Sequence, residues 1–125
     1  MIRLASQEEA IEILNEKQNA ESIGLVTEKT IYQPWIVQVD NFKMMFVFWM
    51  IDKETCNVHV ACKKDSILKS REMAKEILNF LFSCGVSRVI TDCPKGKISN
   101  FVVKLEMKPY KCDEETTFFE ILSWL

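Results

Sequence analysis

The chain has 125 residues, and 16 basic and 18 acidic side chains give it a net charge of −2. This length fits one domain of ordinary size, and a hydrophobic fraction of 48% is typical of a globular protein rather than a disordered one. We therefore predict a single domain over residues 1–125. The small net charge provides no general attraction to nucleic acid or to an anionic membrane, so we expect neither as a partner.

The cysteines and the apolar runs bear on metal binding and location. There are five cysteines, none in CxxC spacing, and a single histidine, so we expect no Cys/His zinc site and reduced thiols in a cytosolic protein. Residues 1–5 lack the apolar stretch of a signal peptide, and the longest apolar run, residues 44–51, is too short to span a bilayer. The predicted location is the cytoplasm.

The first third of the chain predicts a strand, a helix and an ambiguous segment. Residues 2–5 are a short apolar start, and Ser6 followed by Glu9 has the spacing of a capping box. Apolar residues at helical spacing then predict a helix over about residues 7–17. Residues 18–33 fit either a short helix or a loop.

Residues 35–62 predict an antiparallel meander of three strands. Residues 35–39 alternate between apolar and polar side chains, residues 43–51 are almost wholly apolar, and residues 57–62 are again rich in β-formers. Turn-forming residues separate them at Asp40-Asn41 and at residues 52–55.

The next segment predicts a strand–helix–strand crossover. Residues 63–70 are a polar connection, in which Ser66 or Ser70 is the expected helix cap. The following helix is predicted to end near Cys84, with Gly85 just beyond it. Residues 88–91 then read as a short strand, and a strand–helix–strand order favours a parallel strand pair.

The last quarter predicts a helix and two closing strands. Residues 92–96 are expected to form a loop, residues 98–105 an amphipathic helix, and residues 109–112 and 116–125 two strands.

This order of elements resembles the GNAT superfamily of N-acetyltransferases over nearly the whole chain. The best local match is residues 58–111, where the helix ending in KLEMKPYK is similar to the family's "klGF" followed by a strand. The resemblance implies an α/β (α+β) fold with a mixed, mainly antiparallel twisted sheet of six to seven strands. Three to four helices are expected to flank it.

The resemblance also implies acetyl-CoA as cofactor, lying where two parallel strands splay apart. In the family, backbone amides at the start of the central helix hold the pyrophosphate with a motif close to Q/R-x-x-G-x-G/A, because glycines admit the phosphates and the helix N-terminus favours negative charge. The expected cofactor-binding residues are Val60 and Cys62 on the strand and Lys69, Ser70, Arg71, Glu72, Met73 and Ala74 at the helix start.

Two departures from the family pattern weaken the prediction of catalysis. Glu72 stands where the first glycine of the phosphate motif belongs, and a carboxylate there crowds and repels a pyrophosphate. Glu106 takes the place of the "GF" glycine. Val102 therefore stands where many members carry a tyrosine that protonates the leaving thiolate, and valine donates no proton.

His59 and Cys62 are the reactive candidates on the predicted strand. His59 suits a general base that deprotonates an acceptor amine, or else it is a structural histidine with one bonded nitrogen. Cys62 acts as a nucleophile only with a lowered pKa, and is otherwise structural. The two fall on opposite faces of an ideal strand, so they do not form a catalytic pair.

Charge and aromatic content suggest two interaction surfaces. Basic clusters lie around the second predicted helix and near the third, and they fit either anion binding or an ordinary solvated surface. The aromatic residues of the meander are expected in the core. If one face of the sheet is uncovered, Phe118, Phe119 and Trp124 favour a homodimer through the C-terminal strands.

Two functions remain open at this point. The first is acyl-CoA-dependent transfer to an amine, with His59 or a water as base. The second is a non-catalytic, GNAT-shaped binding or assembly module. Short, Lys-rich proteins of this shape occur among tailed bacteriophages, and VHVACKK and KGKISNF resemble them, which implies a head-assembly or internal virion protein in the host cytoplasm or the virion.

Overall fold

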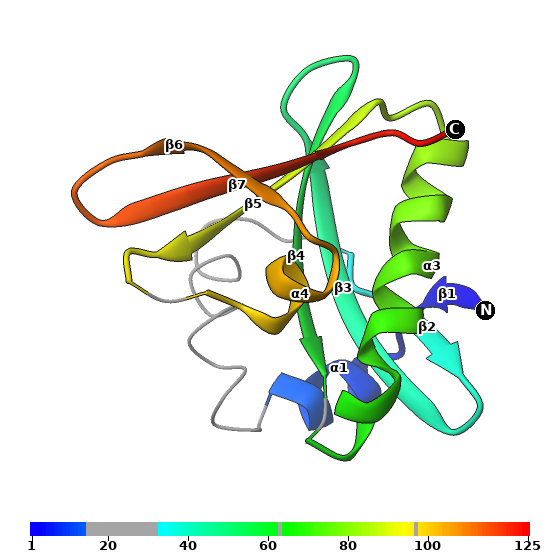
Figure 1. Cartoon of the computed structure of the whole chain (residues 1–125). Coiled ribbons are helices and arrows are strands. Elements are labelled where there is room, and N and C mark those ends of the chain that lie inside the picture. Colours follow the sequence, from blue (N-terminus) through cyan, green and yellow to red (C-terminus); the bar gives the residue numbers. More distant parts are fainter. Residues whose placement is uncertain (15–32, 63, 97) are drawn as a thin grey trace.

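A computed structural model describes residues 1–14, 33–62, 64–96 and 98–125. Within these residues one sheet of seven strands has the order β1-β2-β3-β4-β5-β7-β6 (Figure 1). The strands are β1 (Ile2–Leu4), β2 (Trp35–Val39), β3 (Phe42–Met50), β4 (Thr55–Cys62), β5 (Arg88–Pro94), β6 (Lys108–Cys112) and β7 (Thr116–Leu122). Only β4 and β5 are parallel neighbours, so the predicted mixed, mainly antiparallel sheet is confirmed.

Helices cover both faces of this sheet. In the described part of the chain they are α1 (Gln7–Leu14), the 3₁₀ helix η1 (Lys64–Lys69), α3 (Ser70–Ser83) and α4 (Asn100–Lys104). The helices α3 and α4 pack on one face, where their apolar residues join the larger core cluster. Helix α1 packs on the opposite face through Ala10 and Ile13, which contact Ile36, Met45 and Ala61 (Figure 1).

The larger core contains an aromatic cluster from the meander. Trp35, Phe46 and Phe48 stack or tilt against one another, with ring centroids 6.1 to 6.4 Å apart, and Phe80 of α3 closes the group. Phe46 is fully buried. The expected core role is therefore confirmed for these residues, because the face that they occupy is covered by α3, whereas Trp49 is part of neither core cluster.

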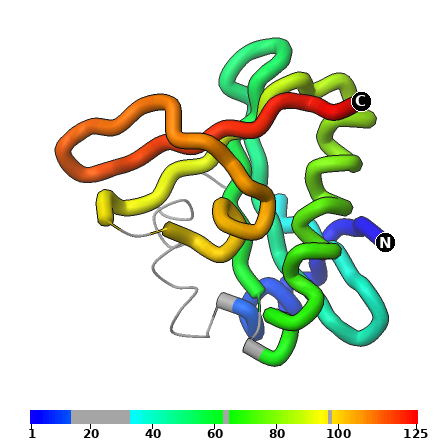
Figure 2. Tube along the Cα trace, viewed as in Figure 1, coloured from blue at the N-terminus to red at the C-terminus, as the bar shows by residue number. Residues whose placement is uncertain are grey.

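Both ends of the chain lie beside α3 (Figure 2). The N-terminal ammonium is 3.0 Å from Glu76 Oε2. The Trp124 indole N–H donates to Asn79 Oδ1 at 2.8 Å, and its ring stands edge-on to Phe82. The last strand, β7, is inserted between β5 and β6.

The parallel pair of β4 and β5 is short. Its register runs from Thr55↔Arg88 to Asn57↔Ile90, although β4 continues to Cys62 and β5 to Pro94. The strands therefore diverge after three paired positions. One side-chain bond spans the gap just beyond, where Thr91 Oγ1 donates to the Val58 carbonyl at 2.8 Å.

Two of the three predicted helix-end features are confirmed. Ser6 and Glu9 form the predicted capping box of α1, since each side chain accepts from the other's backbone N–H at 3.2 Å. Helix α3 ends at Ser83 with Cys84 as its C-cap, and Gly85 lies just beyond it as predicted, with a φ of 101°. Ser99 caps α4, accepting from the Val102 N–H.

The expected serine cap of α3 is wrong. The N-cap residue is Lys69, which makes no side-chain capping bond, because η1 runs directly into α3. Ser70 instead donates its hydroxyl to the Ile67 carbonyl at 2.7 Å, and Ser66 accepts from the Lys43 N–H.

Several predictions fall partly outside the described residues. The first helix was predicted to reach residue 17 and is described to Leu14, and the ambiguous segment 18–33 is described only at Gln33. The predicted loop at residues 92–96 is wrong at its start, because β5 extends to Pro94. No described helix is long and apolar enough to cross a membrane. All five cysteines are free thiols.

Candidate functional site

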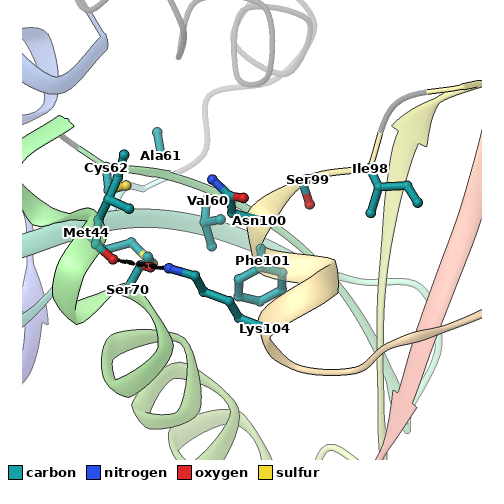
Figure 3. A pocket seen from close by; sticks show the side chains of 11 residues that line it. Met44, Val60, Ala61, Cys62, Ser70, Ile98, Ser99, Asn100, Phe101 and Lys104 are labelled. Atoms are coloured by element: carbon teal, nitrogen blue, oxygen red, sulfur yellow. Dashed lines mark hydrogen bonds between the residues drawn. The ribbon is translucent and has the colours of Figure 1, made fainter.

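A cavity of about 360 Å³ opens where β4 and β5 diverge, on the face covered by α3 and α4 (Figure 3). Its walls come from the end of β4, the η1–α3 junction and the start of α4. The lining residues are Met44, Val60, Ala61, Cys62, Ile67, Ser70, Ile98, Ser99, Asn100, Phe101 and Lys104. This volume is in the range of pockets that hold small ligands.

The β4 backbone at this cavity has no ladder partner in β5. The described β4–β5 pairing ends at Asn57↔Ile90, and the Val58 carbonyl beyond it is already bonded to Thr91. Because buried backbone groups require hydrogen-bond partners, the edge at Val60 and Ala61 can bond an extended amide-containing ligand as a further strand does.

Lys104 is the charged residue of this lining among the described residues. Its ammonium reaches from α4 to the start of α3, where it donates to the Ile67 carbonyl at 3.1 Å and to the Ser70 hydroxyl (Figure 3). Both partners are neutral acceptors. Lys104 belongs to the basic cluster near the third predicted helix (Lys95, Lys97, Lys104, Lys108 and Lys111), for which anion binding is one of the sequence interpretations. Its contact with the start of α3 was not predicted, because it stands in the polar "k" position of the "klGF"-like segment.

The predicted cofactor-binding residues divide into two groups. Val60, Cys62 and Ser70 line the cavity. Met73 and Ala74 are buried in the core, and Arg71 is exposed. Lys69 and Glu72 pair with each other at 3.3 Å, with the Glu72 side chain 59% exposed, so neither belongs to the cavity lining.

His59 lies at the same divergence but on the other face of the sheet. Its Nε2 is 3.0 Å from Asp92 Oδ1, and this contact spans β4 and β5 two register positions beyond their last pair. The imidazole also stacks on the Trp49 ring, with centroids 5.5 Å apart and planes 3° from parallel. The His59 side chain is 13% exposed.

The environment keeps Asp92 ionised. The hydrogen bond from His59 is the main cause that lowers the pKa of Asp92 below its usual value, outweighing the burial that acts to raise it, and Asn57 adds a further bond. The Asn57 Oδ1 atom is buried and has no hydrogen-bond partner. An ionised carboxylate bonded to imidazole orients the ring and stabilises its protonated form, as a base requires.

The predicted separation of His59 and Cys62 is confirmed. Ala61, which shares the parity of His59, packs on the α1 side, whereas Cys62 packs against the α3 cluster. The partner of His59 was missed because Asp92 was assigned to a loop. The available signal was its position: Asp92 follows the predicted strand 88–91 directly, on the strand parallel to β4.

The end of α4 agrees with the alignment to the "klGF" segment. Glu106 has a φ of 54°, a left-handed conformation that glycine adopts at low cost. Val102, four residues earlier, is 3% exposed and faces the core. The cavity lining therefore includes no phenol at this position. Among the described residues, no group of three metal-ligand side chains is present either.

Comparison with known proteins supports one fold. No family model and no curated protein sequence matches the chain. Solved structures do: an N-acetyltransferase of Campylobacter jejuni, PseH, in complex with acetyl coenzyme A has a TM-score of 0.67 at 14% identity, covering 98% of this chain and 99% of that one.

Two further structures agree. A GNAT family acetyltransferase from Elizabethkingia anophelis with acetyl-CoA bound has a TM-score of 0.71 at 8% identity, and covers 98% of this chain and 97% of that one. A Bacillus subtilis acetyltransferase in complex with CoA has a TM-score of 0.69 at 11% identity, with the same coverage. From end to end, then, the chain has the fold of the GNAT N-acetyltransferases.

Proposed function

We propose that this protein transfers an acyl group from acyl-CoA to an amine. The observation that carries the proposal is the divergence of β4 and β5, which has the cavity on one face and the His59–Asp92 pair on the other. Proteins of the same fold have been crystallised with acetyl-CoA or CoA, which supports acetyl-CoA as the donor.

The residues of the cavity fit the pantetheine arm of such a donor. That arm is an extended chain with two amides, and the β4 backbone at Val60 and Ala61, beyond the last β5 pair, supplies matching hydrogen-bond groups. Apolar walls from Met44, Ile67 and Phe101 exclude water around the arm. When the thioester is held where β4 and β5 diverge, it lies close to the acceptor amine. This proximity is the main cause of rate acceleration in such a transfer.

His59 is the proposed base. Because its Nε2 hydrogen is donated to Asp92, Nδ1 keeps the lone pair that accepts a proton from the ammonium or amine. The amine nitrogen then attacks the thioester carbonyl carbon, the C–N bond forms and the C–S bond breaks. The leaving thiolate takes its proton from water, since Val102 supplies none.

Kinetics on the purified chain test this proposal. We expect acetyl-CoA to bind in isothermal titration and free thiol to be released with at least one member of a panel of primary amines. His59→Ala should lower kcat by roughly 10² or more while leaving KM for acetyl-CoA within a few-fold. Asp92→Asn should lower kcat less.

A matched control is available on the β2–β3 turn. Asp40 is exposed and has a φ of 54°, which asparagine tolerates, so Asp40→Asn makes the same chemical change as Asp92→Asn far from the gap. It should leave kcat unchanged. Full activity of His59→Ala would remove the histidine from the mechanism.

A second candidate function is a non-catalytic binding or assembly module. It is favoured by the buried Val102 and by Glu72 in the first turn of α3. Titration separates the two. If the wild-type chain does not bind CoA and Glu72→Gly does, the cofactor site has been lost and a protein partner should be sought instead.

A further inference from the structure

The strongest unexplained feature is the charge of Lys104. Its ammonium lines the cavity, and among the described residues no carboxylate is within ion-pair distance of it. The neighbouring cation, Lys69, has its charge offset by Glu72. A half-buried ammonium that contacts only a carbonyl and a hydroxyl is poorly compensated, because desolvation costs energy that neutral acceptors repay only in part.

The backbone N–H groups at the start of α3 do not form an open anion-binding loop. The 3₁₀ helix η1 runs into α3 without a break, and the Ser70 hydroxyl and the Lys104 ammonium both bond the Ile67 carbonyl there. A cation at this end of a helix is also disfavoured by the helix dipole. An anion that enters the cavity and pairs with Lys104 would compensate the charge of the ammonium and would also interact favourably with the helix dipole.

We infer that Lys104 is the phosphate-binding residue of the cavity, in place of a glycine-lined amide loop. This inference rests on the proposed function, since it assigns the contact for the pyrophosphate of acyl-CoA. The Lys104 ammonium stays near Ser70 and exchanges its bond to the Ile67 carbonyl for charge-assisted bonds to phosphate oxygens, which are the stronger type. Lys104 thus binds the donor and takes no part in the chemical step.

Calorimetric titration of the full chain with three probes tests the assignment. The probes are CoA, inorganic pyrophosphate and S-acetylpantetheine, which lacks phosphate. Lys104→Met should weaken binding of CoA and pyrophosphate by roughly tenfold or more and leave S-acetylpantetheine binding unchanged. Lys104→Arg, which keeps the charge, should stay within about threefold of wild type. The affinity of wild type for CoA should also fall more steeply with salt than that of Lys104→Met.

The control is Lys75→Met, which removes the same charge from an exposed position on α3 outside the cavity lining. It should change CoA affinity less than twofold. Equal CoA affinity in Lys104→Met and wild type overturns the assignment while leaving acyl transfer intact. Phosphate binding that depends on Lys104, without any turnover, supports the assignment and counts against the proposed transfer. A wild type that binds neither CoA nor pyrophosphate overturns both.

Discussion

Glu9 joins three elements through one carboxylate. Its oxygens accept two bonds from the Arg3 guanidinium of β1 at 2.7 Å and one from Lys43 of β3 at 3.0 Å, and the same side chain completes the capping box of α1. The Arg3 hydrogen bonds are the main cause that lowers the pKa of Glu9 far below its usual value. The carboxylate is therefore ionised in the folded protein well into the acid range.

This arrangement makes stability depend on pH in a defined direction. Because the pKa of Glu9 is lower in the folded than in the unfolded chain, its contribution is complete above the unfolded value of about 4.3 and is lost as pH falls below it. Glu9→Gln should lower the free energy of unfolding by about 1–2 kcal/mol at pH 7 and by less at pH 3, because the contribution has begun to fall there. Urea unfolding at the two pH values measures this; an equal loss at both would contradict the account.

Helices α3 and α4 end in the same motif built with different residues. After α3, the N–H groups of Gly85 and Val86 bond the carbonyls of Phe82 and Leu81; after α4, those of Glu106 and Met107 bond Val103 and Val102. Both sets are the paired bonds of a Schellman motif, which needs a left-handed residue just beyond the helix. Glycine occupies that position after α3 and glutamate after α4, with φ values of 101° and 54°.

The glutamate in this position carries a conformational cost that glycine does not. We predict that Glu106→Gly raises the free energy of unfolding by about 0.5–1 kcal/mol, because the side chain is exposed and glycine adopts the left-handed conformation without strain. The matched change, Gly85→Ala, should lower it by a similar or larger amount. Thermal unfolding of the two variants tests this prediction. Destabilisation by Glu106→Gly would show that the carboxylate stabilises the fold.

Elements with a clear periodicity or a turn signal were predictable, and the exceptions have physical causes. The buried run of β3 and the capping box of α1 depend on local side-chain types, so the sequence displays them. The serine cap of α3 failed because the connection before it coils into η1, which leaves no free first turn to cap. Strand β5 was predicted too short because its last residues, Asp92 to Pro94, are held by pairing to β7 rather than by their own propensity.

At the scale of the whole molecule, some of the exposed apolar residues lie at one end of the sheet. Ile51 is 53% exposed and Leu122 is 63% exposed. Thr55 pairs with Arg88, and Arg88 pairs with Leu122, so this row of paired residues marks one end of the sheet, where Ile51 also lies. Trp124, just beyond, is 48% exposed. A homodimer through the C-terminal strands, expected from the sequence, stays a prediction, and this end of β7 is the surface on which we place it.

Sedimentation velocity over a range of concentrations tests for such a dimer. We expect a reversible monomer–dimer equilibrium that Leu122→Lys shifts toward monomer by at least about tenfold in dissociation constant, as expected for a charge at a buried apolar contact. Val103→Lys is the control, since Val103 is 60% exposed on α4. A wild type that stays monomeric at all concentrations would rule the dimer out.

The part of the candidate site that depends on the order of the strands could be predicted from the sequence, and the rest could not. Strand β4, the crossover and the parallel pair place Val60, Cys62 and Ser70 at one cavity, and family resemblance indicated those positions. Two contacts were not predicted because each spans the fold: Asp92 reaches His59 from a neighbouring strand, and Lys104, known from the sequence only as a member of a basic cluster, reaches α3 from a helix more than thirty residues later. Such pairings depend on register and helix length, which local patterns do not encode.

The stack of Trp49 on His59 gives the site a built-in optical signal. An imidazolium quenches indole emission by accepting an electron from the excited ring, and the two planes here are 3° from parallel. Trp35 packs among phenylalanines and Trp124 against Phe82, so neither lies against an imidazole. Trp49 emission is therefore sensitive to the placement of the His59 ring in the unlabelled protein, so a ligand that moves the imidazole away from the indole should change the intrinsic fluorescence.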